Sequence, residues 1–229
     1  LVMKPQESQA DQQAAFDYTV ANISKKPGMM AENTVKGSQF NQPLLEFSGS
    51  CAGCAETSYA RLITQLFGER MFISNATGCS SIWGGPAATT PYTVNKNSGH
   101  GPAWANSLFE DNAEHGLGMA LGHNAIRERL IARVEELMNA TTNPEKKAAC
   151  EAYLATKDDG KANAAATKAL VAELEKDASC ECCAELLKNK EFLAKKSYWI
   201  FGGDGWAYDI GFGGLDHVIA SGMDVNIMV

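Results

Sequence analysis

The chain has 229 residues, of which 45% are hydrophobic and 21% are charged, and it carries a formal net charge of −7. These fractions are typical of globular proteins and exclude disordered, collagen-like and coiled-coil chains, while the acidic charge argues against a nucleic-acid binder. The apolar runs are far shorter than the ~20 residues of a membrane helix, and the first twenty residues hold no signal-peptide stretch, so we expect neither a membrane span nor secretion.

Charge and glycine are unevenly distributed along the chain. Residues 124–196 hold 13 basic and 13 acidic residues, so the flanking parts carry the whole net charge. Only one of the 21 glycines, Gly160, lies within residues 123–201. This glycine-poor block, rich in Ala, Lys, Glu and Leu, is predicted to be a helical insertion. We therefore divide the chain into an N-terminal arm, a cysteine-bearing part, the insertion and a final part, over residues 1–43, 44–123, 124–196 and 197–229.

The arm and the cysteine-bearing part have simple predicted elements. A short helix is expected over residues 11–23, after which Pro and Gly interrupt the arm. Leu44–Phe47 is predicted to be a buried strand, Ala55–Phe67 has helical spacing, and Met71–Ser74 is a second strand. Such a βαβ unit implies a parallel sheet with ligand loops at the carboxyl ends of its strands. Residues 84–123, rich in Gly, Asn and aromatic residues, are expected to form a rim of loops.

The remaining elements continue the same α/β pattern. Helical periodicity covers Asn124–Met138, Ala148–Tyr153 and Ala162–Leu187 in the insertion. A strand over residues 197–201 leads to the segment GGDGWAYDIGFGG, which is followed by a helix over residues 215–221 and a strand over residues 225–229. The sequence thus predicts a parallel α/β fold with a helical insertion, and its final strand suggests a fragment that is cut off at the C-terminus.

Three of the seven cysteines lie in glycine-rich sequence where loops are expected. Without a signal peptide, cysteines favour metal or redox chemistry over a disulfide framework. Cys51-Ala-Gly-Cys54 can wrap one corner of a metal or cluster and Cys79 can supply another ligand, but a zinc ion or a [4Fe–4S] cluster needs four. The alternatives are buried, unliganded cysteines or a redox disulfide. Cys182 and Cys183 are expected to be structural rather than ligands.

A second candidate site is the Gly202-Gly-Asp204-Gly-Trp206 turn between a predicted strand and helix. Glycines at such a turn let the backbone approach a phosphate. Residues 202–229 contain four Asp and no Lys or Arg, so a diphosphate there would need a divalent cation, and Asp204 is the natural ligand for Mg²⁺. A plain Gly-Asp-Gly turn without function remains the alternative for this motif alone.

Two long segments together resemble a known family. LLEFSGSCAGCAETSYARLITQLFGERMFISNATGCSSIWGG and SYWIFGGDGWAYDIGFGGLDHVIASGMDVNIMV resemble the thiamine-diphosphate-binding domain near the C-terminus of pyruvate:ferredoxin (flavodoxin) oxidoreductase. The resemblance covers nearly the whole chain and is loosest in the insertion. Ala55 departs from it, because the family usually has Gly directly after the CxxC.

The resemblance implies a set of site residues. Cys51, Cys54 and Cys79 would ligate a [4Fe–4S] cluster, and Glu56 and Cys79 would border the thiamine diphosphate. Its diphosphate would be held by the turn after the third predicted strand, with Asp204 on Mg²⁺. The residues implied for that turn are Gly203, Asp204, Gly205 and Trp206. The fourth cluster cysteine and the catalytic residues would lie outside this chain, so the chain alone is expected to be inactive.

The function implied by the resemblance is the oxidative decarboxylation of pyruvate to acetyl-CoA and CO₂. Electrons would pass through the cluster to ferredoxin or flavodoxin. The implied partners are pyruvate, coenzyme A, the rest of the same polypeptide and a second copy in a homodimer, in the cytoplasm or an anaerobic organelle. The rival interpretation is a non-catalytic metal-binding module in which Cys51, Cys54 and Cys79 hold zinc.

Overall fold

The computed structural model describes residues 2–23, 28–96, 98–176 and 180–229. Its strands are β1 (Met71–Asn75), β2 (Ala103–Asn106), β3 (Ser197–Phe201) and β4 (Asn226–Met228). A π-helical turn covers Gly205–Ile210. The α-helices are α1 (Ala10–Asn22), α2 (Val35–Ser38), α3 (Glu56–Phe67), α4 (Cys79–Gly84), α5 (Asn112–Ala140), α6 (Pro144–Ala155), α7 (Gly160–Lys176), α8 (Glu181–Lys188) and α9 (Phe212–Ala220).

The strands form one parallel sheet in the order β2-β1-β3-β4. This arrangement confirms the predicted parallel α/β fold. At the centre of the sheet Ile73 of β1 pairs with Trp104 on one side and with Trp199 on the other. The chain leaves β1 in one direction to reach β2 and later leaves β3 in the other direction to reach β4. The point where the strand order reverses therefore lies between β1 and β3.

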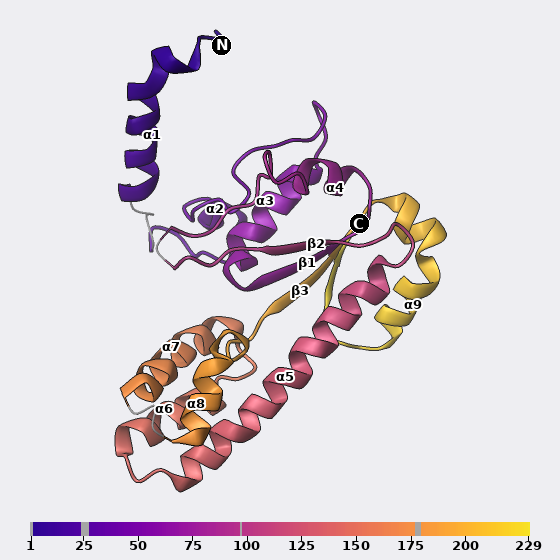
Figure 1. Ribbon diagram of the computed structural model, residues 1–229. Coiled ribbons are helices and arrows are strands. Elements are labelled where there is room, and N and C mark those ends of the chain that lie inside the picture. The colour runs from indigo at the N-terminus through magenta and orange to yellow at the C-terminus, as the bar shows by residue number, and fades with distance from the viewer. Residues whose placement is uncertain (1, 24–27, 97, 177–179) are drawn as a thin grey trace.

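Helices cover both faces of the sheet (Figure 1). Alternate side chains of a strand point to opposite faces, so Ile73 and Phe201 pack with Trp83 on the face of α3 and α4. Ile200 packs with Ala113 of α5 and with residues of α9 on the opposite face. Both faces are buried, which explains why the strands read as nearly continuous apolar runs.

One helix, α5, joins the sheet to the insertion. It begins beside the strands and runs away from them, and α6, α7 and α8 pack around its far half (Figure 1). This far half has its own core, a buried cluster that includes Leu130 and Val134 of α5 together with Tyr153, Leu170 and Leu186. The insertion is therefore a separate lobe, and α5 connects it to the sheet.

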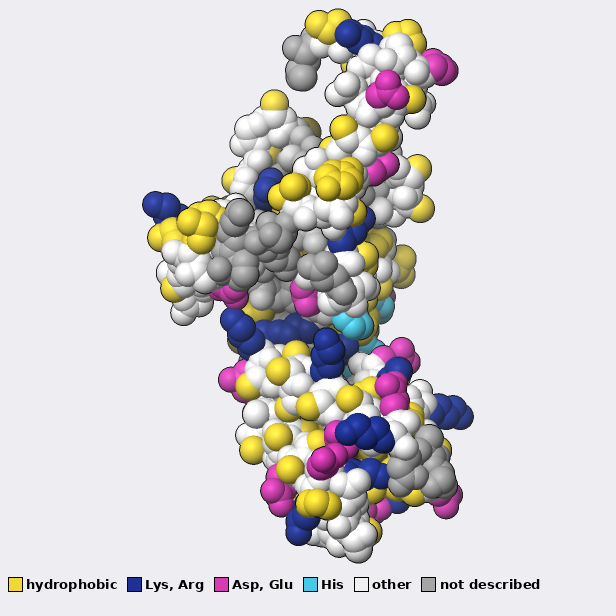
Figure 2. Space-filling model, turned by 90° about the vertical axis from the view of Figure 1, so that its left-hand side faces the viewer, with side chains coloured by type: hydrophobic (Ala, Val, Ile, Leu, Met, Phe, Trp, Pro, Cys, Tyr) yellow, Lys and Arg dark blue, Asp and Glu magenta, His cyan; other side chains and the backbone are white. Residues whose placement is uncertain are grey.

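The junction between the two lobes is rich in cationic side chains. Figure 2 shows Lys and Arg side chains gathered at the waist of the molecule. Arg127 of α5 donates to the carbonyl oxygens of Leu193 and Lys157, at 3.0 and 2.7 Å. Lys195 pairs with Asp224, which joins the start of β3 to the segment before β4. The two Arg127 contacts brace the insertion internally, and the pair between Lys195 and Asp224 joins the end of the insertion to the segment before β4. No helix in the described part of the chain is long and apolar enough to cross a membrane.

Two predictions from the sequence are wrong. Leu44–Phe47 is not a strand of the sheet, because only Leu45 forms an isolated antiparallel bridge, with Tyr92. The bridging partner lies 47 residues further along the chain, so local sequence does not reveal it. Residues 84–123 are not all loop, since they contain β2 and the first three turns of α5.

The first turns of α5 contain three glycines. Glycine usually weakens a helix, so the sequence did not indicate a helix there. Gly116 has a packing reason: a Cβ there would lie 2.5 Å from Ile200 Cγ1 and 3.2 Å from Ser74 Cβ. The absence of a side chain lets α5 approach the sheet closely. Gly118, on the same helix, is exposed and has nothing within 4 Å of the position of a Cβ.

These two glycines form a matched pair for a test of stability. Gly116→Ala should lower the free energy of unfolding by about 1–3 kcal/mol, because the methyl group overpacks the contact with Ile200. Gly118→Ala should raise it by up to about 1 kcal/mol through helix propensity. Urea unfolding followed by circular dichroism measures both. Equal effects of the two substitutions would contradict the close packing.

Candidate functional site

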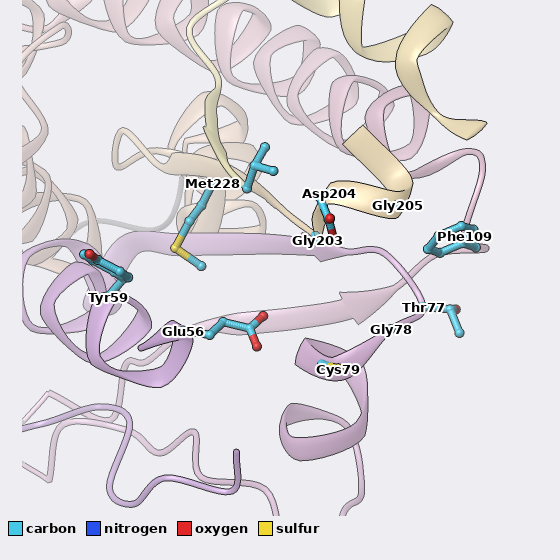
Figure 3. Close-up of a pocket in the computed structure, with 12 residues that line it drawn as sticks. Glu56, Tyr59, Thr77, Gly78, Cys79, Phe109, Gly203, Asp204, Gly205 and Met228 are labelled. Carbon is cyan, nitrogen blue, oxygen red and sulfur yellow. The ribbon is translucent and has the colours of Figure 1, made fainter. Parts of the chain in front are cut away.

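A pocket of about 530 Å³ opens at the carboxyl ends of β1, β3 and β4. It lies at the reversal point between β1 and β3, where parallel α/β sheets usually bind their ligands. The loop after β1 contributes Thr77, Gly78 and Cys79, and the loop after β3 contributes residues 202–205 (Figure 3). The other lining residues are Glu56, Tyr59, Phe109, Met228 and Val229.

One buried amide holds the strand ends that form this pocket. The Asn112 side chain, at the start of α5, donates to the Phe201 carbonyl oxygen at 2.8 Å. Its Oδ1 accepts from Ser74 Oγ at 2.7 Å and from Ser107 Oγ at 3.0 Å. Asn112 therefore connects β1, the residue after β2, and β3 directly before the pocket loops begin.

The Gly-Asp-Gly turn is shaped by Trp206, whose side chain is fully buried. A Cβ on Gly202 would lie 2.5 Å from Trp206 Cε3, so glycine is needed for the turn to pack on the indole. A Cβ on Gly203 would meet nothing within 4 Å, which leaves backbone accessible at the pocket wall. Trp206 itself packs in the core with Ala76 and Leu215 and does not line the pocket.

Glu56 is held in place by a tryptophan from the opposite helix. Its Oε2 accepts a hydrogen bond from Trp83 Nε1 at 3.0 Å. The Glu56 side chain extends from the first turn of α3 towards α4 (Figure 3). Trp83 is 5% exposed and belongs to α4, the helix that begins with Cys79. The short helix α4 thus positions both Glu56 and Cys79 at the pocket.

The polar groups of the pocket determine which ligands suit it. Glu56 and Asp204 are the charged residues among those that line it, and both are acidic. A diphosphate would be repelled by them unless a divalent cation lay between the carboxylate and the phosphate oxygens. Asp204 is exposed and offers the oxygen ligand that Mg²⁺ prefers. The donor set therefore fits a diphosphate bound together with a divalent cation.

The three cysteines lie on two segments near the pocket. Cys51 and Cys54 end a tight turn in which Cys54 N–H donates to the Cys51 carbonyl oxygen at 3.0 Å. Gly53 has φ +82°, a conformation that favours glycine and explains this residue inside the CxxC. Cys79 lines the pocket, whereas Cys51 and Cys54 lie before α3, close in sequence to Glu56.

All three of these thiols are exposed and free. Within the described ranges, no group of three or more His, Cys, Asp or Glu residues is placed to hold a metal ion. The structure therefore does not gather Cys51, Cys54 and Cys79 into one metal site, and their role as cluster ligands remains a prediction.

Some lining residues were not singled out from the sequence. Tyr59 is one turn after Glu56 on α3, where its spacing indicated a buried helix position, yet it is 62% exposed at the pocket. Phe109 comes from the segment that was expected to form a rim of loops, and a Cβ on Gly205 would lie 3.2 Å from its ring. Thr77 comes directly before the Gly-Cys pair that followed the predicted strand. Its position beside that pair was the one feature of the sequence that pointed to Thr77.

Comparisons with known proteins agree with the resemblance described above, although no protein-family model matches the chain. The chain is 52% identical over 231 residues to the pyruvate-flavodoxin oxidoreductase of Klebsiella pneumoniae, which covers all of this chain and 20% of that protein. It is 58% identical over 202 residues to the pyruvate:ferredoxin oxidoreductase of Moorella thermoacetica, which covers 86% of this chain and 17% of that protein.

A third relative is named for a different electron acceptor. The mitochondrial pyruvate dehydrogenase [NADP(+)] of Euglena gracilis is 45% identical over 226 residues, or 95% of this chain and 12% of that protein. The chain thus spans about a fifth or less of the length of these curated relatives. Its resemblance to a segment of pyruvate:ferredoxin and pyruvate-flavodoxin oxidoreductases is confirmed over the full chain.

The contact between Trp83 and Glu56 can be tested by a double-mutant cycle. We expect Trp83→Phe and Glu56→Ala to be coupled by about 1–2 kcal/mol in the free energy of unfolding, because a hydrogen bond from a buried donor to a carboxylate is lost in either variant. Urea unfolding of the two single variants and the double variant gives the coupling. Additive effects would show that Trp83 does not hold the carboxylate.

Proposed function

Because the chain aligns throughout with a segment of pyruvate:ferredoxin and pyruvate-flavodoxin oxidoreductases, we propose that it forms the part of such an enzyme that binds thiamine diphosphate and Mg²⁺. The observation that carries the proposal is the pocket between β1 and β3, where Glu56, Cys79 and the Gly-Asp-Gly turn lie together. These residues come from three separate segments of the sequence. Their meeting at one sheet edge supports a common ligand.

In this proposal the turn after β3 binds the diphosphate end of the cofactor. Gly203 and Gly205 leave the backbone accessible, and Asp204 holds the Mg²⁺ that offsets the phosphate charge. Glu56, fixed by Trp83, borders the organic part of the cofactor. Tyr59, Phe109 and Met228 supply apolar walls that exclude water from the pocket.

Thiamine diphosphate supplies the nucleophilic carbon and the electron sink that decarboxylation of a 2-oxoacid requires. The residues of this chain bind and orient it. In the complete enzyme pyruvate would be oxidised to CO₂ and acetyl-CoA, with coenzyme A as the acyl acceptor. Residues that bind pyruvate and coenzyme A are proposed to lie in the rest of the polypeptide.

We further propose that Cys51, Cys54 and Cys79 ligate a [4Fe–4S] cluster beside the cofactor, with a fourth ligand from outside this chain. Their exposed, free thiols and the position of Cys79 in the pocket support this assignment. Electrons would leave towards ferredoxin or flavodoxin. One relative of similar sequence is named for NADP⁺, so the choice of the final acceptor is proposed to be made outside this segment.

Asp204 provides a test of cofactor binding. In the full-length protein, Asp204→Asn should weaken Mg²⁺-dependent binding of thiamine diphosphate by at least about tenfold, because an amide cannot offset the charge of the bound ion as a carboxylate does. Isothermal titration calorimetry measures the affinity. Asp209→Asn is the matched control, since Asp209 is exposed on the next turn but does not line the pocket. If the wild-type protein and both variants bound thiamine diphosphate with equal affinity, Asp204 would not belong to the site.

Cys79 provides a test of the cluster. Cys79→Ser in the full-length protein should lower the iron content and the broad absorbance near ~400 nm, while thiamine diphosphate still binds. Carrier reduction should fall more than CO₂ release, measured in the same assay. Cys182→Ser, in the distant insertion, should change none of these. A colourless protein that binds zinc through these cysteines would instead favour a zinc module.

A further inference from the structure

A second cysteine pair lies far from the pocket, in the insertion. Cys180 and Cys183 form a disulfide at the start of α8, with their Cα atoms 5.3 Å apart. The two residues are separated as in a CxxC motif, with Cys182 between them. The pairing was not predicted from the sequence. Neither cysteine lines the pocket between β1 and β3.

The disulfide spans too short a segment to restrain the chain strongly. Loop-closure effects grow with the number of residues that a disulfide encloses, and only two residues lie between Cys180 and Cys183. A short dithiol at the first turn of a helix is instead the arrangement found in exchange-active sites, because the helix N-terminus and nearby cations favour the thiolate. Both features are present here.

The two sulfurs have different surroundings. Cys180 is half-buried, caps α8 and accepts a hydrogen bond from Cys183 N–H at 3.0 Å. Cys183 is fully buried in the core of the insertion, and Lys146 Nζ lies 3.8 Å from its Sγ. Cys180 is therefore the sulfur that solvent can reach, whereas the cation stands beside Cys183.

A second pocket is lined in part by Cys180. Its volume is about 430 Å³, and it lies between the end of α5, the start of α6 and α8. Lys146, Cys180 and Cys182 line it together with Glu136, Thr141 and Thr142. Such a pocket is large enough to admit a small thiol to Cys180.

The neighbouring cysteines are poor competitors for exchange. Burial raises the pKa of the Cys150 thiol to about 11 and also raises the pKa of Cys182. Cys182 Sγ is directed at the Arg133 carbonyl oxygen, at 3.4 Å. Both thiols should therefore remain protonated near neutral pH, and thiols are poor nucleophiles in that form.

We propose that the Cys180–Cys183 disulfide is a redox-active site that exchanges with low-molecular-mass thiols. A thiolate RS⁻ attacks Cys180 Sγ, which forms a Cys180–SR mixed disulfide and releases Cys183 as a thiolate beside Lys146. A second RS⁻ attacks the sulfur of the R group and releases RSSR and the Cys180 thiolate. Two RSH thus reduce one disulfide to two thiols with transfer of two electrons, and RSSR reverses the reaction.

The test uses the full-length protein in anaerobic glutathione buffers, followed by acid quench, alkylation and peptide mass spectrometry. Cys180 and Cys183 should become alkylatable together, over about a 100-fold range of [GSH]²/[GSSG], as expected for a two-electron exchange. Cys182→Ser is the matched control and should move the midpoint by less than about threefold. Alkylation of both cysteines that does not depend on the buffer would overturn the proposal.

Two variants assign the roles of the sulfurs. Cys183→Ser should accumulate a glutathione adduct on Cys180, because no buried thiolate can displace it. Cys180→Ser should carry at least about tenfold less adduct, because Cys183 is buried. Equal adducts in the two variants, or an adduct on Cys182 in the wild-type protein, would contradict the assignment. The wild-type titration needs no variant, so it tests the exchange even if a substitution disturbs folding.

Discussion

The buried side chain of Asn112 is the interaction on which the arrangement of the pocket depends. Its amide bonds to Phe201 at the end of β3 and accepts from Ser74 in β1 and Ser107 after β2. A buried amide costs free energy unless it is hydrogen-bonded, so this network has one well-satisfied geometry. It aligns the ends of three strands, and the loops that leave two of them form the walls of the pocket. The first turn of α5, which carries Asn112, can reach the strands because Gly116 brings the helix close to Ile200.

The chemistry of the pocket follows from its charge. Two carboxylates and no cationic side chain line it, so an anion would be repelled there unless a divalent cation offset the charge. The relatives named for flavodoxin, ferredoxin and NADP⁺ differ in electron acceptor, yet each aligns with most of this chain. This pattern supports the proposal that the segment takes part in the step that these relatives share, the reaction of pyruvate. The disulfide lies in the insertion, which has its own core, and neither of its cysteines lines the pocket.

Local patterns in the sequence predicted most helices and three of the four strands of the described sheet, β1, β3 and β4. α3, β1, β3 and α9 have strong periodicity or apolar runs bounded by glycine, and all four occur close to their expected residues. The errors share a cause, which is that contacts distant in sequence override local preference. Leu45 meets Tyr92 rather than joining the sheet, and α5 begins at Asn112 despite its glycines because those glycines face a strand or solvent.

The sequence by itself determined the parallel α/β class, the family resemblance and the candidacy of Glu56, Cys79 and Asp204. It did so because strand and helix periods, glycine turns and carboxylate or thiol side chains are local properties. Only the tertiary structure decided which candidates share a pocket. It brought Glu56 and Cys79 to the Gly-Asp-Gly turn and turned Trp206 into the core beneath it. It also paired Cys180 with Cys183, because pairing depends on the distance and direction of side chains that folding alone sets.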